Sequence, residues 1–104
     1  MTLYNFRKLV SKHYAEKRLP KEYAAMLAIT SNHLNALCVE HLGISAGKFI
    51  RNKILLEAER LLVNTDLSVT EIANKLGFND SSYFTKFFKK YAVVTPEEFK
   101  KRQL

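Results

Sequence analysis

The stretch of sequence that decides the fold is residues 68–99, SVTEIANKLGFNDSSYFTKFFKKYAVVTPEEF. Ser68 and Glu71 have the spacing of a capping box, so they predict the start of a helix that ends near residue 76. Gly77 tolerates the positive φ that a tight turn requires, and Asp80 then predicts the start of a second helix. A short helix, a turn and a second helix in this order are typical of a helix-turn-helix unit.

The same pattern occurs earlier in the chain. Residues 22–49 align with residues 71–99 at an offset of 49 positions, which becomes 50 after a one-residue insertion. Apolar residues align with apolar residues, as in the pairs Leu27 and Leu76, Leu34 and Phe84, Cys38 and Phe88, and Phe49 and Phe99. Because a solenoid needs at least three stacked repeats, two copies indicate a duplicated supersecondary unit inside one domain.

Helical periodicity and capping residues predict about seven helices. They cover residues 1–15, residues 21–27 after Pro20, residues 31–42 after a turn at 28–30, residues 45–64 as one long connecting helix, residues 68–76, residues 80–92, and a closing helix that opens with Thr95-Pro96-Glu97-Glu98. We therefore expect one all-α domain over residues 1–104. Its first helix-turn-helix subunit spans about 1–44, its connecting helix about 45–64 and its second subunit about 65–104.

The composition favours this fold class and excludes others. Three Gly and two Pro among 104 residues are too few for a loop-rich β sandwich. Folding at this length buries only ~65% of the surface of the unfolded chain, which leaves little material for a shielded catalytic pocket, so a large enzyme is excluded.

The charge and the single cysteine limit the partners and the compartment. Seventeen Lys and Arg against ten Asp and Glu give a formal charge of +7, which favours a polyanionic partner such as nucleic acid. One cysteine, Cys38, excludes a disulfide framework and fits a reducing compartment, so we expect a cytoplasmic protein. No apolar run approaches the ~20 residues of a membrane helix, and the N-terminus lacks the pattern of a signal peptide.

The second helix of each unit carries side chains that suit double-stranded DNA. The major groove admits one helix, base edges need hydrogen-bond donors and acceptors, and phosphates need Lys or Arg or the start of a helix. The candidate base-reading residues are Ser81, Ser82, Tyr83, Thr85 and Lys86 in the second unit and Ser31, Asn32, Asn35 and Ala36 in the first. The candidate phosphate contacts are Lys89, Lys90 and Asp80 in the second unit and Thr30 in the first.

The two units differ in charge at these helices. Residues 81–92 carry three lysines and no acid, whereas residues 31–42 carry only Glu40, with Val39 and Glu40 standing where the second unit has Lys89 and Lys90. We therefore expect non-specific attraction to DNA to lie mainly in the second unit. The connecting helix, at ~1.5 Å per residue, is a rod of roughly 30 Å. Since successive major grooves on one face lie ~34 Å apart, both second helices could enter adjacent grooves.

Residues 66–99 closely resemble the second helix-turn-helix of the AraC/XylS family of bacterial transcription regulators. The resemblance rests on Gly77-Phe78, Ser82-Tyr83-Phe84, Phe88-Lys89-Lys90 and Thr95-Pro96-Glu97-Glu98-Phe99. The first unit is similar through Tyr23-Ala24, Thr30-Ser31, His33-Leu34, Leu56-Glu57-Ala58 and Leu61-Leu62. The chain departs from the family pattern at Ala36 and Val39, where Arg or Lys is usual, and at Cys38, where Phe is usual.

The resemblance implies a seven-helix DNA-binding domain whose two recognition helices read adjacent major grooves of a promoter. It also implies RNA polymerase as a partner. Many family members are about three times longer and carry an N-terminal effector-sensing or dimerisation domain. We interpret this chain as the C-terminal part of such a regulator rather than a small stand-alone one.

Two other classes of function stay open. A helical adaptor that binds proteins through its grooves would show little salt dependence, whereas phosphate binding weakens steeply as salt rises. An enzyme ranks last, because Cys38 and His41 on one helix lack a third partner and a cavity. We expect no cofactor and no metal site. Helical spacing assigns the aromatic stripe to the core; its members are Phe84, Phe87, Phe88 and Tyr91.

Overall fold

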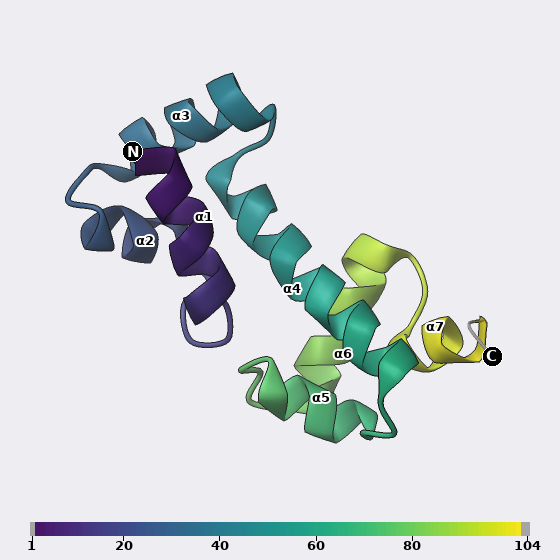
Figure 1. Ribbon diagram of the computed structural model, residues 1–104. Coiled ribbons are helices and arrows are strands. Elements are labelled where there is room, and N and C mark those ends of the chain that lie inside the picture. Colours follow the sequence, from purple (N-terminus) through teal and green to yellow (C-terminus); the bar gives the residue numbers. More distant parts are fainter. Residues whose placement is uncertain (1, 103–104) are drawn as a thin grey trace. The chain divides into compact units, whose positions relative to one another are not determined.

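The computed structural model describes residues 2–102 and contains seven α-helices and no strand among them (Figure 1). The helices are α1 (Thr2–His13), α2 (Pro20–Met26), α3 (Ser31–Leu42), α4 (Ala46–Asn64), α5 (Val69–Lys75), α6 (Ser81–Ala92) and α7 (Pro96–Arg102). The predicted all-α class, the two helix-turn-helix units and the long connecting helix are confirmed. The first helix is shorter than the predicted 1–15 because the chain turns after His13; Met1 lies outside the described residues.

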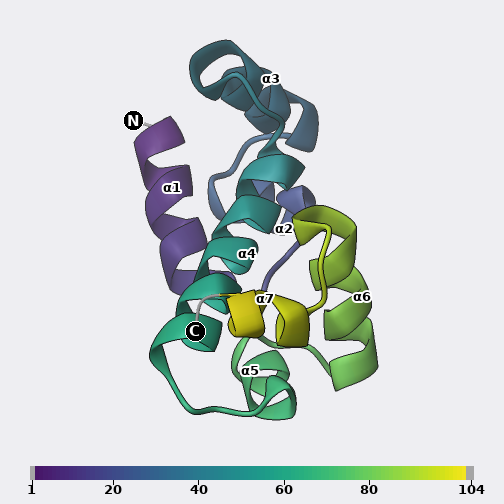
Figure 2. The ribbon, with the colours of Figure 1, turned by 90° about the vertical axis from the view of Figure 1, so that its right-hand side faces the viewer.

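The chain forms two compact units, Met1–Lys53 (unit 1) and Ile54–Leu104 (unit 2). Each unit contains one helix-turn-helix, and the boundary falls inside α4. In unit 1, α1, α2 and α3 lie around the N-terminal half of α4 (Figure 1). In unit 2, α5, α6 and α7 gather around its C-terminal half (Figure 2). The division of residues 1–104 into subunits at 44 and 65 within one DNA-binding domain stays a prediction.

Aromatic rings build the core of each unit. In unit 1 the rings of Phe6 and Tyr23 meet edge to face with their centroids 5.7 Å apart, and both side chains are fully buried. In unit 2 Phe84 and Phe88 are fully buried, as predicted. We expect Tyr91 in the same stripe, but it is 37% exposed because it lies in the last turn of α6, which ends at Ala92.

Reciprocal hydrogen bonds fix helix starts in unit 2. The Ser68 hydroxyl accepts the N–H of Glu71 at 3.1 Å, and the Glu71 carboxylate accepts the N–H of Ser68 at 2.8 Å, so the predicted capping box is confirmed. Thr95 and Glu98 form the same pair at 3.1 and 2.9 Å. The hydrogen bond from the Ser68 backbone is the main cause that lowers the pKa of Glu71.

Positive φ angles occur at equivalent places in the two units, but the glycines do not. At the turn, φ is +57° at Ala28 and +87° at Gly77. At the end of the recognition helix, φ is +74° at Gly43 and +75° at Val93. Each unit thus has one glycine and one residue with a Cβ in the left-handed region, where an L-residue is disfavoured by about 1–2 kcal/mol.

We predict that Ala28→Gly and Val93→Gly each stabilise the protein by about 1 kcal/mol, because glycine removes the steric penalty at positive φ. Gly77→Ala should destabilise it by a similar amount. Urea unfolding measures all three changes. The matched control is Ala25→Gly, an exposed site in α2 without a positive φ, where glycine should destabilise the helix by about 1 kcal/mol. The same sign at residues 25 and 28 would contradict the prediction.

The hydroxyl of Tyr23 titrates abnormally. It donates to the carbonyl oxygen of Lys17 at 2.7 Å. Burial, with smaller contributions from the charges of Glu22 and Glu16, raises the pKa of Tyr23 to about 12. The folded state therefore holds the phenol proton more tightly than the unfolded chain. The stability that this phenol contributes is complete below the ordinary pKa of about 10 and is lost as the pH rises toward 12.

We expect Tyr23→Phe to lose less stability than the wild type when the pH rises from 8 to 11, because phenylalanine cannot ionise. At pH 8 the variant should be less stable by about 1 kcal/mol, the usual contribution of one hydrogen bond. Urea unfolding at both pH values measures the two effects. Tyr4→Phe, at a ring that is 58% exposed, serves as the control and should follow the wild type. Equal alkaline losses in Tyr23→Phe and wild type would show that the Tyr23 proton is not the cause.

Candidate nucleic-acid interface

Both recognition helices start at a side-chain cap. The Thr30 hydroxyl accepts the N–H of His33 at 3.0 Å before α3, and the Asp80 carboxylate accepts the N–H of Tyr83 at 2.7 Å before α6. The two predicted phosphate contacts are therefore helix caps. Since the Asp80 carboxylate is negatively charged, a phosphate contact at this residue has to come from the backbone.

The recognition helix of unit 2, α6, presents a polar and basic face. Ser82, Tyr83 and Lys86 are exposed, and so are Lys89 and Lys90 further along the helix. Ser81 and Thr85 are half-buried, because they lie beside the buried Phe84 and Phe88. The Tyr83 ring packs edge to face on Phe78, with centroids 5.7 Å apart, so its direction is fixed by the core beneath it. The candidate readers of unit 2 thus share one helix.

Two of the lysines on α6 have partners within the protein. The Lys90 Nζ lies 5.3 Å from the centroid of the Tyr91 ring. Lys89 lies near enough to Glu98 for its charge to lower the pKa of that carboxyl, although the hydrogen bond from the Thr95 backbone is the larger cause. Within residues 2–102 neither Lys86 nor Lys89 belongs to a described ion pair.

The recognition helix of unit 1, α3, is nearly neutral on its outer face. Ser31, Asn32 and Ala36 are exposed, and Val39 is 51% exposed at the place that Lys89 occupies in unit 2. The carboxylate of Glu40 lies 3.4 Å from the imidazole of His41. This helix offers DNA few charges, as the sequence predicted.

Asn35 has a partner that sequence analysis missed. Its side-chain oxygen accepts the backbone N–H of Ala46 at 3.0 Å, which joins the middle of α3 to the first residue of α4. The repeat contains a signal for this bond: Asn35 aligns with Thr85 and Ala46 aligns with Pro96, so both partners of the bond are replaced together in the second unit.

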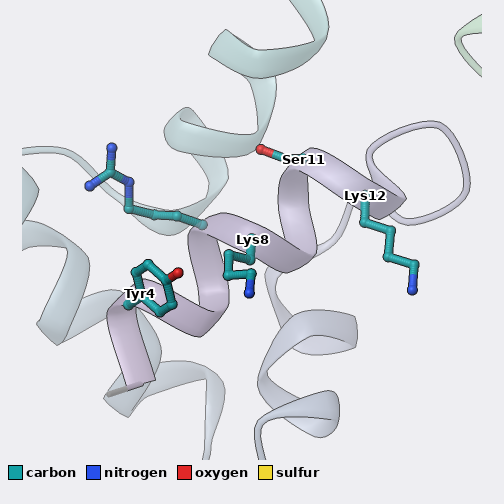
Figure 3. Close-up of a pocket in the computed structure, with 5 residues that line it drawn as sticks. Tyr4, Lys8, Ser11 and Lys12 are labelled. Carbon is teal, nitrogen blue, oxygen red and sulfur yellow. The ribbon is translucent and has the colours of Figure 1, made fainter.

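A basic surface on α1 was also missed. Arg7, Lys8 and Lys12 are exposed on this helix, whose sequence contains no acid. Together with Tyr4 and Ser11 they line a shallow hollow of about 640 Å³ (Figure 3). In the sequence, residues 1–53 hold nine basic and three acidic side chains, and residues 54–104 hold eight and seven. The Lys and Arg residues of unit 1 therefore all lie outside its recognition helix.

Cys38 and His41, which share α3, differ in their exposure to solvent. Cys38 is fully buried, and burial raises the pKa of its thiol, whereas the His41 side chain is 54% exposed. Within residues 2–102 no group of three or more His, Cys, Asp or Glu side chains is placed to hold a metal ion. In the same part of the chain, no helix has the length and hydropathy needed to cross a membrane.

Residues 23–102 match the model of a helix-turn-helix domain family. The chain is 31% identical over 93 residues to the uncharacterised HTH-type transcriptional regulator YpdC of Escherichia coli, an alignment that covers 89% of this chain and 33% of YpdC. The C-terminal domain of AraT, a response regulator from Geobacillus stearothermophilus, has 26% identity and a TM-score of 0.90, with 99% of this chain and 86% of that domain covered.

The DNA-binding domain of the global transcriptional factor AdpA, solved in complex with a target DNA, has the same fold. It superposes with a TM-score of 0.84 at 20% identity, over 96% of this chain and 90% of that domain. The chain spans about a third of the length of several curated relatives that it matches.

Proposed function

The chain belongs to the AraC/XylS family of helix-turn-helix transcription regulators, and on this premise we propose that it binds double-stranded promoter DNA in a sequence-specific manner with both recognition helices. The observation that carries the proposal is the duplication: α3 and α6 each follow a short helix, a positive-φ turn and a side-chain cap. A single chain thereby has two helices of the kind that enter a major groove.

We assign base reading to side chains near the start of each recognition helix. The exposed ones are Ser31, Asn32 and Ala36 on α3 and Ser82, Tyr83 and Lys86 on α6, and the half-buried Ser81 and Thr85 lie beside them on α6. Phosphate contacts come from Lys89, Lys90 and the backbone at Thr30 and Asp80. Adjacent major grooves are the proposed targets of the two helices, because the duplication supplies two readers in one chain.

The relatives' length favours further partners. YpdC is about three times longer than the segment matched here, so we propose that an effector-sensing or dimerisation domain accompanies this chain in the intact regulator. Regulation of a promoter would bring RNA polymerase as a second partner and require the cytoplasm of a bacterial cell.

The first test is footprinting on a duplex selected from a random DNA pool. We expect one chain to protect two successive major grooves on one face of the duplex, over roughly two helical turns. Binding should weaken steeply between 50 and 200 mM salt, since phosphate contacts release counterions. Protection of a single groove would contradict the two-helix proposal. Absence of DNA binding at 50 mM salt would leave the protein-binding adaptor as the function.

Single lysine variants separate base reading from phosphate binding. Lys90→Ala should weaken binding to all sequences alike and reduce the salt slope by about one unit. Lys89→Ala should have the same effect on the slope, since Lys89 is also exposed on α6. Lys86→Ala should cost ~1–3 kcal/mol on the selected site and relax preference at one position, as expected for a lysine on a guanine edge. Lys101→Ala, exposed on α7, is the control. Identical behaviour of the three α6 variants would refute the assignment of roles.

A further inference from the structure

We propose that Asn35 is a positioning residue that fixes the recognition helix α3 to the first turn of α4. The inference rests on the proposed function, since it assigns to Asn35 the orientation of the helix that meets DNA in unit 1. It replaces the expectation that Asn35 reads bases by a role in holding α3 in place.

The hydrogen bond satisfies a backbone group that the helix cannot satisfy itself. Ala46 is the first residue of α4 and is fully buried. The N–H groups in the first turn of a helix have no acceptor within the helix, so the Ala46 N–H needs a partner from outside. The Asn35 Oδ1, 3.0 Å away and eleven residues earlier, is that partner. Without it, a buried donor would remain unpaired at considerable cost.

Unit 2 meets the same requirement in a different way. Pro96 stands where unit 1 has Ala46, and proline has no N–H that needs an acceptor. Thr85, a shorter side chain, stands where unit 1 has Asn35. Unit 1 therefore has both the Ala46 N–H and the Asn35 oxygen that accepts it, whereas unit 2 has neither this N–H nor an asparagine at the aligned position. This pairing is expected if the role of Asn35 is to accept the Ala46 N–H.

The start of α7 has a further hydrogen bond without a counterpart in unit 1, and it serves the N–H of Thr95 rather than that of the first helical residue. There the Glu98 carboxylate completes a capping box with Thr95. The aligned residue in unit 1 is Lys48, which has no acceptor atom; only the Ser45 hydroxyl caps the Lys48 N–H, at 3.1 Å. Asn35 thus supplies the second acceptor at the start of α4.

The position of Asn35 makes this bond a constraint on the recognition helix. α3 ends at Leu42, and only residues 43–45 join it to α4. A bond from the middle of α3 to Ala46 closes a ring with this loop and restricts the angle between the two helices. Asn32, a proposed base reader, lies one turn before Asn35 on α3, so its direction depends on that angle.

The same bond makes Asn35 a poor base reader. Asparagine recognises adenine by using its carboxamide oxygen and its NH2 group together. In this structure the oxygen already accepts from Ala46. This bond fixes the orientation of the carboxamide, so the oxygen and the NH2 group are not free to turn together toward an adenine edge.

A double-mutant cycle with the full chain tests the proposal. Asn35→Ala should lower the thermal midpoint by about 5 °C or more and weaken binding to the selected duplex about tenfold, with discrimination reduced at all positions that unit 1 reads. Ala46→Pro removes the donor, as in unit 2. In that background Asn35→Ala should change the midpoint and the affinity by much less, so the coupling between the two sites should be evident.

Further variants keep the test decisive. Asn35→Asp retains an acceptor oxygen and should retain the wild-type midpoint, even if Ala46→Pro fails to fold. Thr85→Ala and Asn32→Ala, which remove no bond to a helix start, should leave the midpoint nearly unchanged. An unchanged midpoint in Asn35→Ala, with altered preference at a single base pair, would overturn the proposal and make Asn35 a reader. Failure of the wild-type chain to bind duplex DNA would refute the proposed function. The thermal midpoints of the variants would still test the hydrogen bond between Asn35 and Ala46.

Discussion

A helix start has backbone N–H groups without partners inside the helix, and this constraint organises the molecule. Each of α3, α5, α6 and α7 begins directly after a side-chain oxygen that accepts such a group, from Thr30, Ser68, Asp80 and Thr95 respectively. Successive residues of a helix are turned by about 100°, so the spacing of the apolar residues decides which side chains face outward. The caps decide where each helix, and with it the exposed face, begins.

The sequence predicted what local chemistry controls. Capping pairs, Gly77 and the apolar periodicity were sufficient to place seven helices. The alignment of the two copies was sufficient to identify α3 and α6 as the two recognition helices. Ala28 and Val93 at positive φ were not predicted, because the sequence signal for that region is glycine and both positions carry a Cβ. The bond between Asn35 and Ala46 was missed for a related reason: it joins two helices, and no spacing rule within one helix reveals it.

The two units have diverged in where they carry positive charge. In unit 2 the recognition helix itself carries Lys86, Lys89 and Lys90 and no acid, while acidic residues elsewhere in the unit nearly balance its total charge. In unit 1 the positive charge lies away from the recognition helix, with Arg7, Lys8 and Lys12 on α1. One duplicated fold therefore carries two distributions of charge, and a comparison restricted to aligned helices does not detect the difference, because α1 has no counterpart in the repeat.

Cys38 gives the chain a built-in reporter. It is the only cysteine in the sequence, and it is fully buried in unit 1. Because a thiol reagent reaches a buried side chain only when the surrounding structure opens, the rate of alkylation measures the local opening of unit 1 without interference from unit 2. Conversely, a cysteine introduced on the surface can be labelled selectively with a fluorophore or spin label in the native state, since the native thiol is shielded from solvent and burial disfavours its reactive thiolate.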